Sequence, residues 1–178
     1  MKLLELINNR QSTRDYASIP IPRDALERCI EAARVSPSAC NSQPWHFIVI
    51  DNQELKNKVA DAAFSGIYFT NSFAKKAPVL IIVVTERSNY LAKLGGQFRG
   101  IQYSLIDIGI ACEHLILQAT EEGLGSCWLG WFSEKGVKKA LDIPDKHKVD
   151  IIISLGYPKN NTLRPKTRKS MDEIRKFI

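Results

Sequence analysis

A regular repeat of apolar residues between positions 102 and 122 restricts the possible folds of this chain more than any other pattern in it. The repeat has the three- and four-residue spacing of one helix face and consists of Leu105, Ile108, Cys112, Leu115, Ile116 and Ala119. Gly123 follows directly and is suited to a helix C-cap, because glycine adopts left-handed backbone angles without strain. The sequence therefore predicts a long central helix.

Compact apolar runs predict the strands that accompany this helix. Residues 47–50 and 79–84 are rich in β-branched side chains, which favours strands buried on both faces. Residues 149–155 predict another buried strand, and residues 126–131 a short one. At least four strands between predicted helices place the chain in the α+β or α/β class.

Shorter helices are predicted from apolar spacing and from capping residues. Apolar spacing predicts helices near residues 3–7, 26–33 and 55–62. Ser133 can cap a helix that runs to Leu141, and residues 170–173 (SMDE) have the form of a capping box for a last helical turn.

Length and composition fit one domain. The chain has 178 residues, 44% of them apolar, and no repeat, low-complexity tract or linker divides it, so we expect a single domain over residues 1–178. The N-terminus lacks the apolar core of a signal peptide, and the run at 79–84 is too short to span a bilayer. A cytoplasmic location without a membrane partner is expected.

The cysteines and the basic residues restrict the kinds of ligand that the chain is expected to bind. Cys29, Cys40, Cys112 and Cys127 show no C-x-x-C spacing and no histidine at metal-ligand spacing, so we expect buried, reduced thiols and no metal site. The formal charge is +6, and residues 159–178 hold seven basic residues against two acidic ones. Such a tail can be a nucleic-acid arm, a solvated terminus or a phosphate site folded back on the domain. Composition alone favours the solvated terminus.

Residues 36–47 (SPSACNSQPWHF) join a turn rich in hydrogen-bonding groups to an apolar segment. Two prolines fix φ and withhold N–H groups, while Ser38, Asn41 and Gln43 supply side-chain donors and acceptors. This arc suits a planar heterocycle with ring carbonyls and nitrogens. We interpret Cys40 within it as a small packed residue, with a reactive thiol as the alternative.

Two further segments can bind phosphate. Arg10, Ser12 and Arg14 alternate, so in an extended segment their side chains leave the same side and form a clamp with forked arginine donors. A solvated edge segment is the alternative interpretation. Lys166 and Arg168 form a second candidate clamp near the C-terminus. No G-x-G-x-x-G motif follows a predicted strand, which argues against a dinucleotide-binding βαβ unit.

In order and spacing, these motifs resemble the nitroreductase family of FMN enzymes. Residues 36–47 match its S-P-S-x-x-N-x-Q-P-W-x-F signature, residues 10–14 its R-x-S-x-[RK] motif, and residues 165–168 its P-K-x-R segment. Further matches lie at residues 123–130 and 156–158. The resemblance implies an α+β nitroreductase-like fold with a mixed, mainly antiparallel sheet flanked by helices. It also implies an intertwined homodimer that binds FMN at the subunit interface.

The resemblance implies a set of FMN-binding residues and no catalytic residue of the protein itself. Clamp residues would hold the phosphate and ribityl chain, and backbone N–H groups at Leu129 and Gly130 would face flavin N5 and O4, where negative charge develops. The implied residues are Arg10, Ser12, Arg14, Pro37, Ser38, Asn41, Gln43, Leu129, Gly130, Lys166 and Arg168.

The function that the resemblance implies is an FMN-dependent oxidoreductase. By a ping-pong mechanism, hydride would pass from NADH or NADPH through the flavin to a nitroaromatic, quinone or similar small acceptor. The alternative is a non-catalytic or flavin-handling FMN protein, such as a redox sensor, or a specialised chemistry such as dehalogenation. A nucleic-acid partner is not expected. The short segment 64–100 predicts an open flavin pocket.

Overall fold

A four-stranded antiparallel sheet forms the middle layer of the computed structural model, which describes residues 2–86 and 100–178. The strands are β1 (Trp45–Ile50), β2 (Val79–Thr85), β3 (Gly125–Leu129) and β4 (Lys148–Gly156). They lie in the order β1-β2-β4-β3, and each neighbouring pair is antiparallel. Ser12 adds an isolated parallel bridge to Ser126, so the predicted mixed, mainly antiparallel α+β fold is confirmed.

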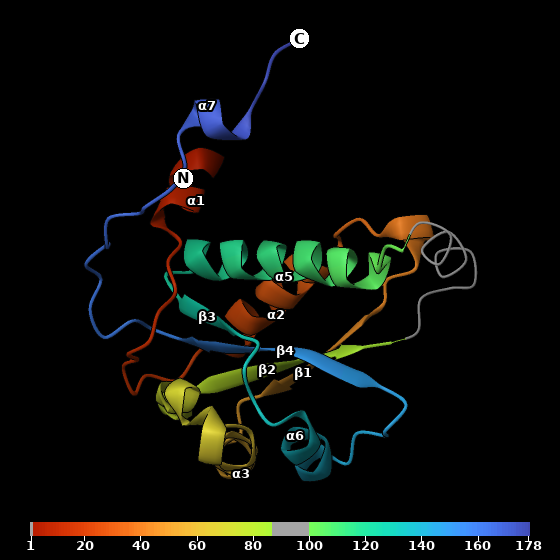
Figure 1. Ribbon diagram of the computed structural model, residues 1–178. Coiled ribbons are helices and arrows are strands. Elements are labelled where there is room, and N and C mark those ends of the chain that lie inside the picture. The colour runs from red at the N-terminus through yellow and green to blue at the C-terminus, as the bar shows by residue number, and fades with distance from the viewer. Residues whose placement is uncertain (1, 87–99) are drawn as a thin grey trace.

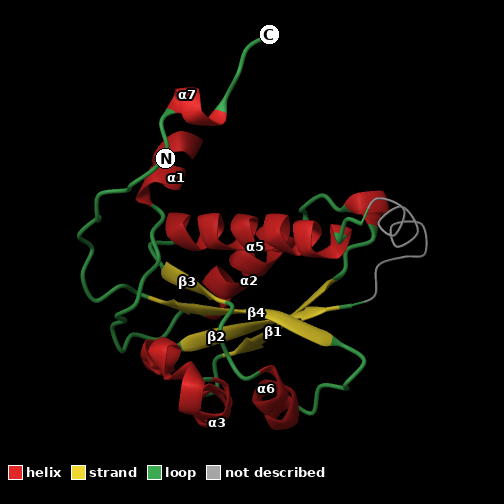
Figure 2. Cartoon of the chain, viewed as in Figure 1, coloured by secondary structure: helices red, strands yellow, loops and turns green. Residues whose placement is uncertain are grey.

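Helices cover both faces of this sheet (Figures 1 and 2). On one face lie α2 (Arg23–Arg34) and α5 (Tyr103–Glu121), and on the other α3 (Gln53–Ala63) and α6 (Glu134–Leu141). The remaining helical elements are α1 (Leu3–Asn9), η1 (Ala39–Asn41), η2 (Gly66–Lys76) and α7 (Met171–Ile174). The predicted helices are therefore present, whereas η1 and η2 are 3₁₀ segments whose short turns carry no apolar stripe to predict them.

Alternation along β2 divides the core into two layers. Leu80 and Ile82 pack with the α3 and α6 side chains, whereas Ile81 and Val83 pack with those of α2 and α5, because successive side chains leave opposite faces of a strand. The prediction of a strand buried on both faces is confirmed for β2. It is wrong for β1, which is an edge strand of the described sheet, pairs there with β2, and has Ile50 as its one buried residue.

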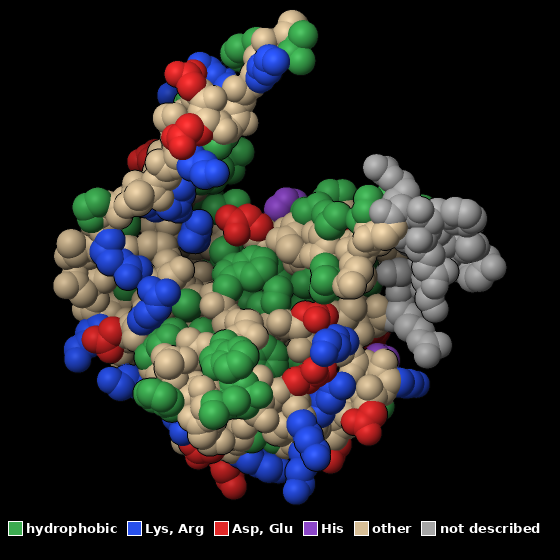
Figure 3. Space-filling view, in the orientation of Figure 1, with side chains coloured by type: hydrophobic (Ala, Val, Ile, Leu, Met, Phe, Trp, Pro, Cys, Tyr) green, Lys and Arg blue, Asp and Glu red, His purple; other side chains and the backbone are tan. Residues whose placement is uncertain are grey.

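The terminal segments project from the body of the molecule (Figures 1 and 3). Leu4 of α1 is 70% exposed and Phe177, beyond α7, is 85% exposed, so both segments present large apolar side chains at the surface of the described part of the chain. Ile106 on α5 and Trp131 after β3 are also more than half exposed. No described helix combines the length and apolar composition needed to cross a membrane. Exposed apolar surface of this extent marks an interaction face.

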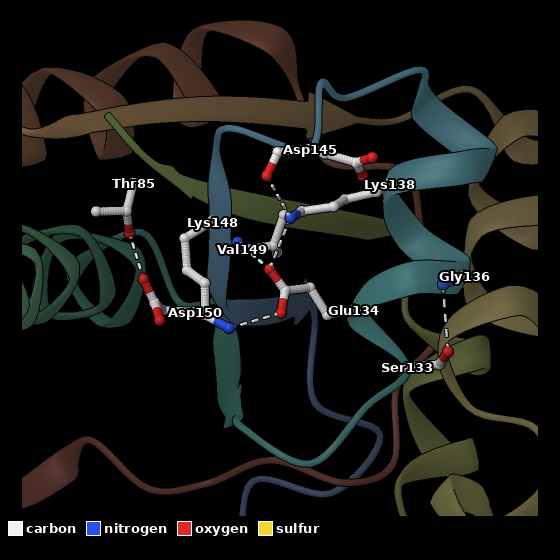
Figure 4. Close-up of polar contacts among 9 residues, drawn as sticks. All are labelled: Thr85, Ser133, Glu134, Gly136, Lys138, Asp145, Lys148, Val149 and Asp150. Atoms are coloured by element: carbon white, nitrogen blue, oxygen red, sulfur yellow. Dashed lines mark hydrogen bonds and ion pairs between the residues drawn. The ribbon is translucent and has the colours of Figure 1, made fainter. Parts of the chain in front are cut away.

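Glu134 ties the start of α6 to β4 (Figure 4). Its carboxylate accepts hydrogen bonds from Lys148 Nζ at 2.7 Å and from the Val149 N–H at 3.1 Å, and it pairs with Lys138 at 3.1 Å. Burial opposes ionisation of Glu134, but these three contacts outweigh it and lower its pKa from 4.5 to about 2. Ionised Glu134 therefore stabilises the folded state.

Replacing Glu134 with glutamine is expected to lower the free energy of unfolding at pH 7 by about 1–2 kcal/mol. The full pKa shift corresponds to roughly 3 kcal/mol, which we reduce because the side chain is 27% exposed and screened by solvent. The folded-state pKa is depressed, so the contribution is complete above pH 4.5 and disappears as the pH falls towards 2. Urea titrations at pH 7 and pH 2.5 test this, with Glu27→Gln on α2 as the control. An equal loss at both pH values would contradict it.

Gly136 lets α6 approach α3 closely. A Cβ at this position would lie 2.5 Å from the carbonyl oxygen of Ala62. Gly136→Ala is expected to lower the free energy of unfolding by about 1–2 kcal/mol, because the backbone clash exceeds the gain in helix propensity. Lys135→Ala, at the exposed neighbouring position, is expected to change it by less than about 0.5 kcal/mol. Thermal unfolding of the two variants measures the difference.

Candidate functional site

Two basic segments that are distant in sequence lie against each other. The Lys166 ammonium donates to the carbonyl of Ile7 at 2.9 Å, and Gln11 Nε2 donates to the carbonyl of Thr162 at 3.1 Å. Arg164 donates to the carbonyl of Ser12. The two segments that these bonds hold together enclose a cavity of about 320 Å³. It is lined by Arg10, Gln11, Ser12, Arg164, Pro165, Lys166, Thr167 and Arg168. We call Arg10, Ser12, Lys166 and Arg168, which were predicted from sequence, the cation cluster.

The electrostatics of the cation cluster favour an anion. Nε of Arg10 is buried without a hydrogen-bond partner in the described part of the chain, and such an atom costs free energy unless an acceptor is supplied. Partial burial, followed by the charges of Arg10 and Arg168, lowers the pKa of the Lys166 ammonium. An anion with several acceptor oxygens would satisfy Arg10 and relieve the repulsion among the cations.

Arg14 takes a different position from Arg10. It lines a neighbouring cavity of about 300 Å³, which shares Gln11, Ser12 and Arg164 with the first. Its guanidinium lies 5.9 Å from the ring centroid of Phe73. Arg164 was missed by sequence reasoning, although it borders both cavities. Its position directly before Pro165 and Lys166 was the sequence feature from which it could have been predicted.

The loop 36–43 has a fixed, strained shape. Cys40, Asn41 and Gln43 have φ values of 51°, 51° and 44°, in the left-handed region that non-glycine residues rarely adopt. The Ser38 hydroxyl accepts the Gln43 N–H at 3.0 Å, and Gln43 Nε2 donates to Asn41 Oδ1 at 3.1 Å. Predicted residues Pro37, Ser38, Asn41 and Gln43 therefore form one polar, partly exposed arc.

The loop and the cation cluster of one chain lie at opposite ends of α5 (Figure 1). The loop contacts the N-terminal part of the helix through Asp107, whereas α1, which ends at the cluster, packs near its C-terminal end. From Asp107 to Glu121 the helix rises about 20 Å at ~1.5 Å per residue. The structure thus places the two predicted halves of the site apart within a single chain.

Gly130 lies in open space directly after β3. A Cβ built there would meet no atom within 4 Å, whereas Leu129, the last residue of the strand, is 2% exposed. The predicted strand 126–131 therefore begins one residue too late and ends two residues too far along the chain, because β3 spans Gly125–Leu129. Beside this position, Asn71 of η2 donates to the carbonyl of Trp131 at 2.9 Å, which fixes η2 against the exit of β3.

Comparison with known proteins decides the family. The sequence profile of the nitroreductase family matches residues 7–69 and 65–157. The chain belongs to the nitroreductase family. A protein of Methanothermobacter thermautotrophicus named "Putative NADH dehydrogenase/NAD(P)H nitroreductase" is 33% identical over 179 residues, which cover 98% of this chain and 85% of that protein.

Solved nitroreductase structures superpose on nearly the whole chain. A nitroreductase family protein from Clostridium novyi NT is 33% identical with a TM-score of 0.78, over 93% of this chain and 89% of that one. An "FMN-dependent Nitroreductase" from Clostridium difficile R20291 is 26% identical with a TM-score of 0.70, over 96% of this chain and 93% of that one. The nitroreductase fold predicted from the sequence is therefore confirmed.

One expectation about this nitroreductase fold falls partly outside the described residues. The short segment 64–100 was predicted to leave the flavin pocket open. Its described part forms η2 and β2, and residues 87–99 lie outside what the structure describes. The openness of the pocket stays a prediction.

Proposed function

We propose that this chain is an FMN-dependent oxidoreductase that uses NADH or NADPH to reduce a small electrophilic acceptor. The observation that carries the proposal is the cation cluster, in which Arg10 Nε has no acceptor among the described residues and lies beside Lys166 and Arg168. A phosphate dianion fits this donor set. Membership of a flavin-dependent family supplies the reason to assign that phosphate to FMN.

The chain's own groups would bind and orient the cofactor. Arg10, Lys166 and Arg168 would neutralise the phosphate, and Arg164 would hold the Ser12 segment in place through its bond to the Ser12 carbonyl. Gly130 lies four residues along β3 from Ser126, the bridge partner of Ser12, or about 13 Å at ~3.3 Å per residue. That span suits a ribityl phosphate chain and the near part of a tricyclic ring.

Bound FMN would supply the redox chemistry, accepting hydride from the nicotinamide and passing it to the acceptor. Backbone N–H groups at Leu129 and Gly130 would stabilise negative charge on the reduced ring, because the open position of Gly130 leaves that backbone accessible. The same pocket would admit nicotinamide and acceptor in turn, which is the basis of a ping-pong reaction. No side chain of the protein is required as a nucleophile.

The separation of the loop from the cation cluster supports a site shared by two copies of the chain. Within one chain, the loop contacts α5 at Asp107, whereas α1, which ends at the cation cluster, packs near the opposite end of that helix. A second copy would bring its loop 36–43 to the cluster of the first, and a two-fold arrangement would complete two sites at once. The exposed apolar side chains of α1, α7 and Trp131 would be covered in such a homodimer.

The visible absorption spectrum of the purified protein tests the proposed function. A protein that releases FMN, bleaches anaerobically with NADH or NADPH, and regains its colour with a nitroaromatic or quinone supports the oxidoreductase. Bound FMN that neither nucleotide reduces would favour the flavin-handling alternative. Reoxidation only by a halogenated phenol, with halide release, would favour dehalogenation. A colourless protein that takes up no FMN would refute the proposal.

A further inference from the structure

Asp107 is a buried carboxylate on α5 to which the proposed chemistry gives no role. Its side chain is 3% exposed, its Oδ1 accepts the Ala39 N–H at 3.0 Å, and its Oδ2 faces the Ser42 hydroxyl at 3.5 Å. Among residues 2–86 and 100–178, no lysine, arginine or histidine forms an ion pair with it. A buried carboxyl group is costly unless hydrogen bonds compensate it, and its two hydrogen-bond partners among the described residues belong to one loop.

That loop needs an external anchor. Its left-handed residues Cys40, Asn41 and Gln43 cost free energy and persist only where surrounding structure holds them. The Asn41 and Gln43 side chains are exposed, and their mutual hydrogen bond does not tie the loop to the body. Asp107 meets the backbone at Ala39, one residue before the first left-handed position.

A second anchor on the same helix holds the start of the loop. The Ser36 hydroxyl, in a residue that is 6% exposed, shares a hydrogen bond of 2.7 Å with His114 Nδ1. Asp107 and His114 are seven residues apart, or two helical turns, so both lie on one face of α5. The helix therefore holds the loop at its start, through Ser36, and directly before its strained part, through Ala39.

We propose that Asp107, assisted by His114, is a positioning residue that holds loop 36–43 in the shape required to contact the flavin ring. This inference rests on the proposed function, in which Ser38, Asn41 and Gln43 meet the flavin bound by a second copy of the chain. Asp107 acts through the loop and touches no cofactor atom. It therefore affects binding of the flavin ring and not binding of the phosphate.

The test compares FMN with riboflavin, which lacks the phosphate. In Asp107→Asn, the Kd values for both are expected to rise at least tenfold with their ratio unchanged. The visible spectrum of the flavin at saturation is also expected to shift, which a general loss of stability would not produce. Asp145→Asn, a charge-matched change of an exposed residue, is expected to leave affinities and spectrum as in the wild type.

Other results would overturn the positioning role. Asp107→Asn with wild-type affinities and spectrum would refute it, and so would a loss confined to FMN. If Asp107→Asn does not fold in urea titrations, Ser36→Ala tests the other anchor, with an expected rise of at least threefold for both flavins; unchanged affinities would count against the proposal. Wild-type protein that binds no FMN would instead refute the proposed function itself.

Discussion

Arg10→Ala is expected to raise the Kd for FMN about 100-fold and to leave the Kd for riboflavin within about twofold of the wild type. The guanidinium has a buried Nε without an acceptor in the part of the chain that the structure describes, so the phosphate would gain a charge-assisted bond that costs little new desolvation. Loss of such a bond is worth about 3 kcal/mol, or two powers of ten in affinity. Fluorescence quenching of each flavin on titration with protein measures both values.

The control for Arg10→Ala is Arg34→Ala. Arg34 lies on α2, pairs with Glu31 at 2.6 Å and is 66% exposed, so its removal changes the net charge equally without touching the cation cluster. It is expected to leave both affinities unchanged. An equal loss of FMN and riboflavin affinity in Arg10→Ala would place Arg10 at the ring and contradict the phosphate assignment.

Two variants that each bind FMN poorly are expected to recover FMN binding when they are co-expressed, if the site is shared between copies. One variant carries Arg10→Ala in the cation cluster, and the other carries Asn41→Ala with Gln43→Ala in the loop. In mixed dimers, one of the two sites combines the intact cluster of one copy with the intact loop of the other. Random mixing at equal amounts gives about a quarter of the wild-type sites. FMN bound per chain after co-expression and purification measures the recovery.

Each variant expressed alone is the baseline for this experiment, and two copies of the Arg10→Ala chain with different tags control for co-expression. Recovery no greater than the mean of the two baselines would contradict a shared site. Sedimentation of each variant shows whether either substitution changes assembly, because a variant that fails to assemble cannot complement.

Local sequence patterns predicted most of the fold for a physical reason. The apolar stripe of α5 and the β-branched run of β2 each predict burial from the local sequence alone. Ile108 and Ile81 could therefore be placed in the core without knowledge of the tertiary structure. The edge position of β1 could not be predicted, because the order of strands depends on long-range pairing. Its apolar residues read like those of a central strand although only Ile50 is buried.

The sequence predicted which segments form the candidate site, but not how these segments are arranged in space. Motif order identified Arg10, Ser12, Lys166 and Arg168, which share one cavity in the structure. The place of Arg164 beside Pro165 made it a candidate, but its contact could not be predicted, because the partner is the carbonyl of Ser12, 152 residues away. Arg14 turns towards Phe73, which belongs to a 3₁₀ segment without a sequence signature. The roles of these residues in FMN binding stay predictions.

The length of α5 fixes the spacing between the loop and the cation cluster within one chain. Because the loop is gripped near one end of this helix and the cation cluster lies near the other, each inserted or deleted residue between them would rotate one end by about 100° and shift it by ~1.5 Å. Two-fold symmetry would apply the same error to both sites at once. We therefore expect insertions in the connecting segments to be tolerated, and a single insertion between Asp107 and Glu121 to uncouple the halves of the site.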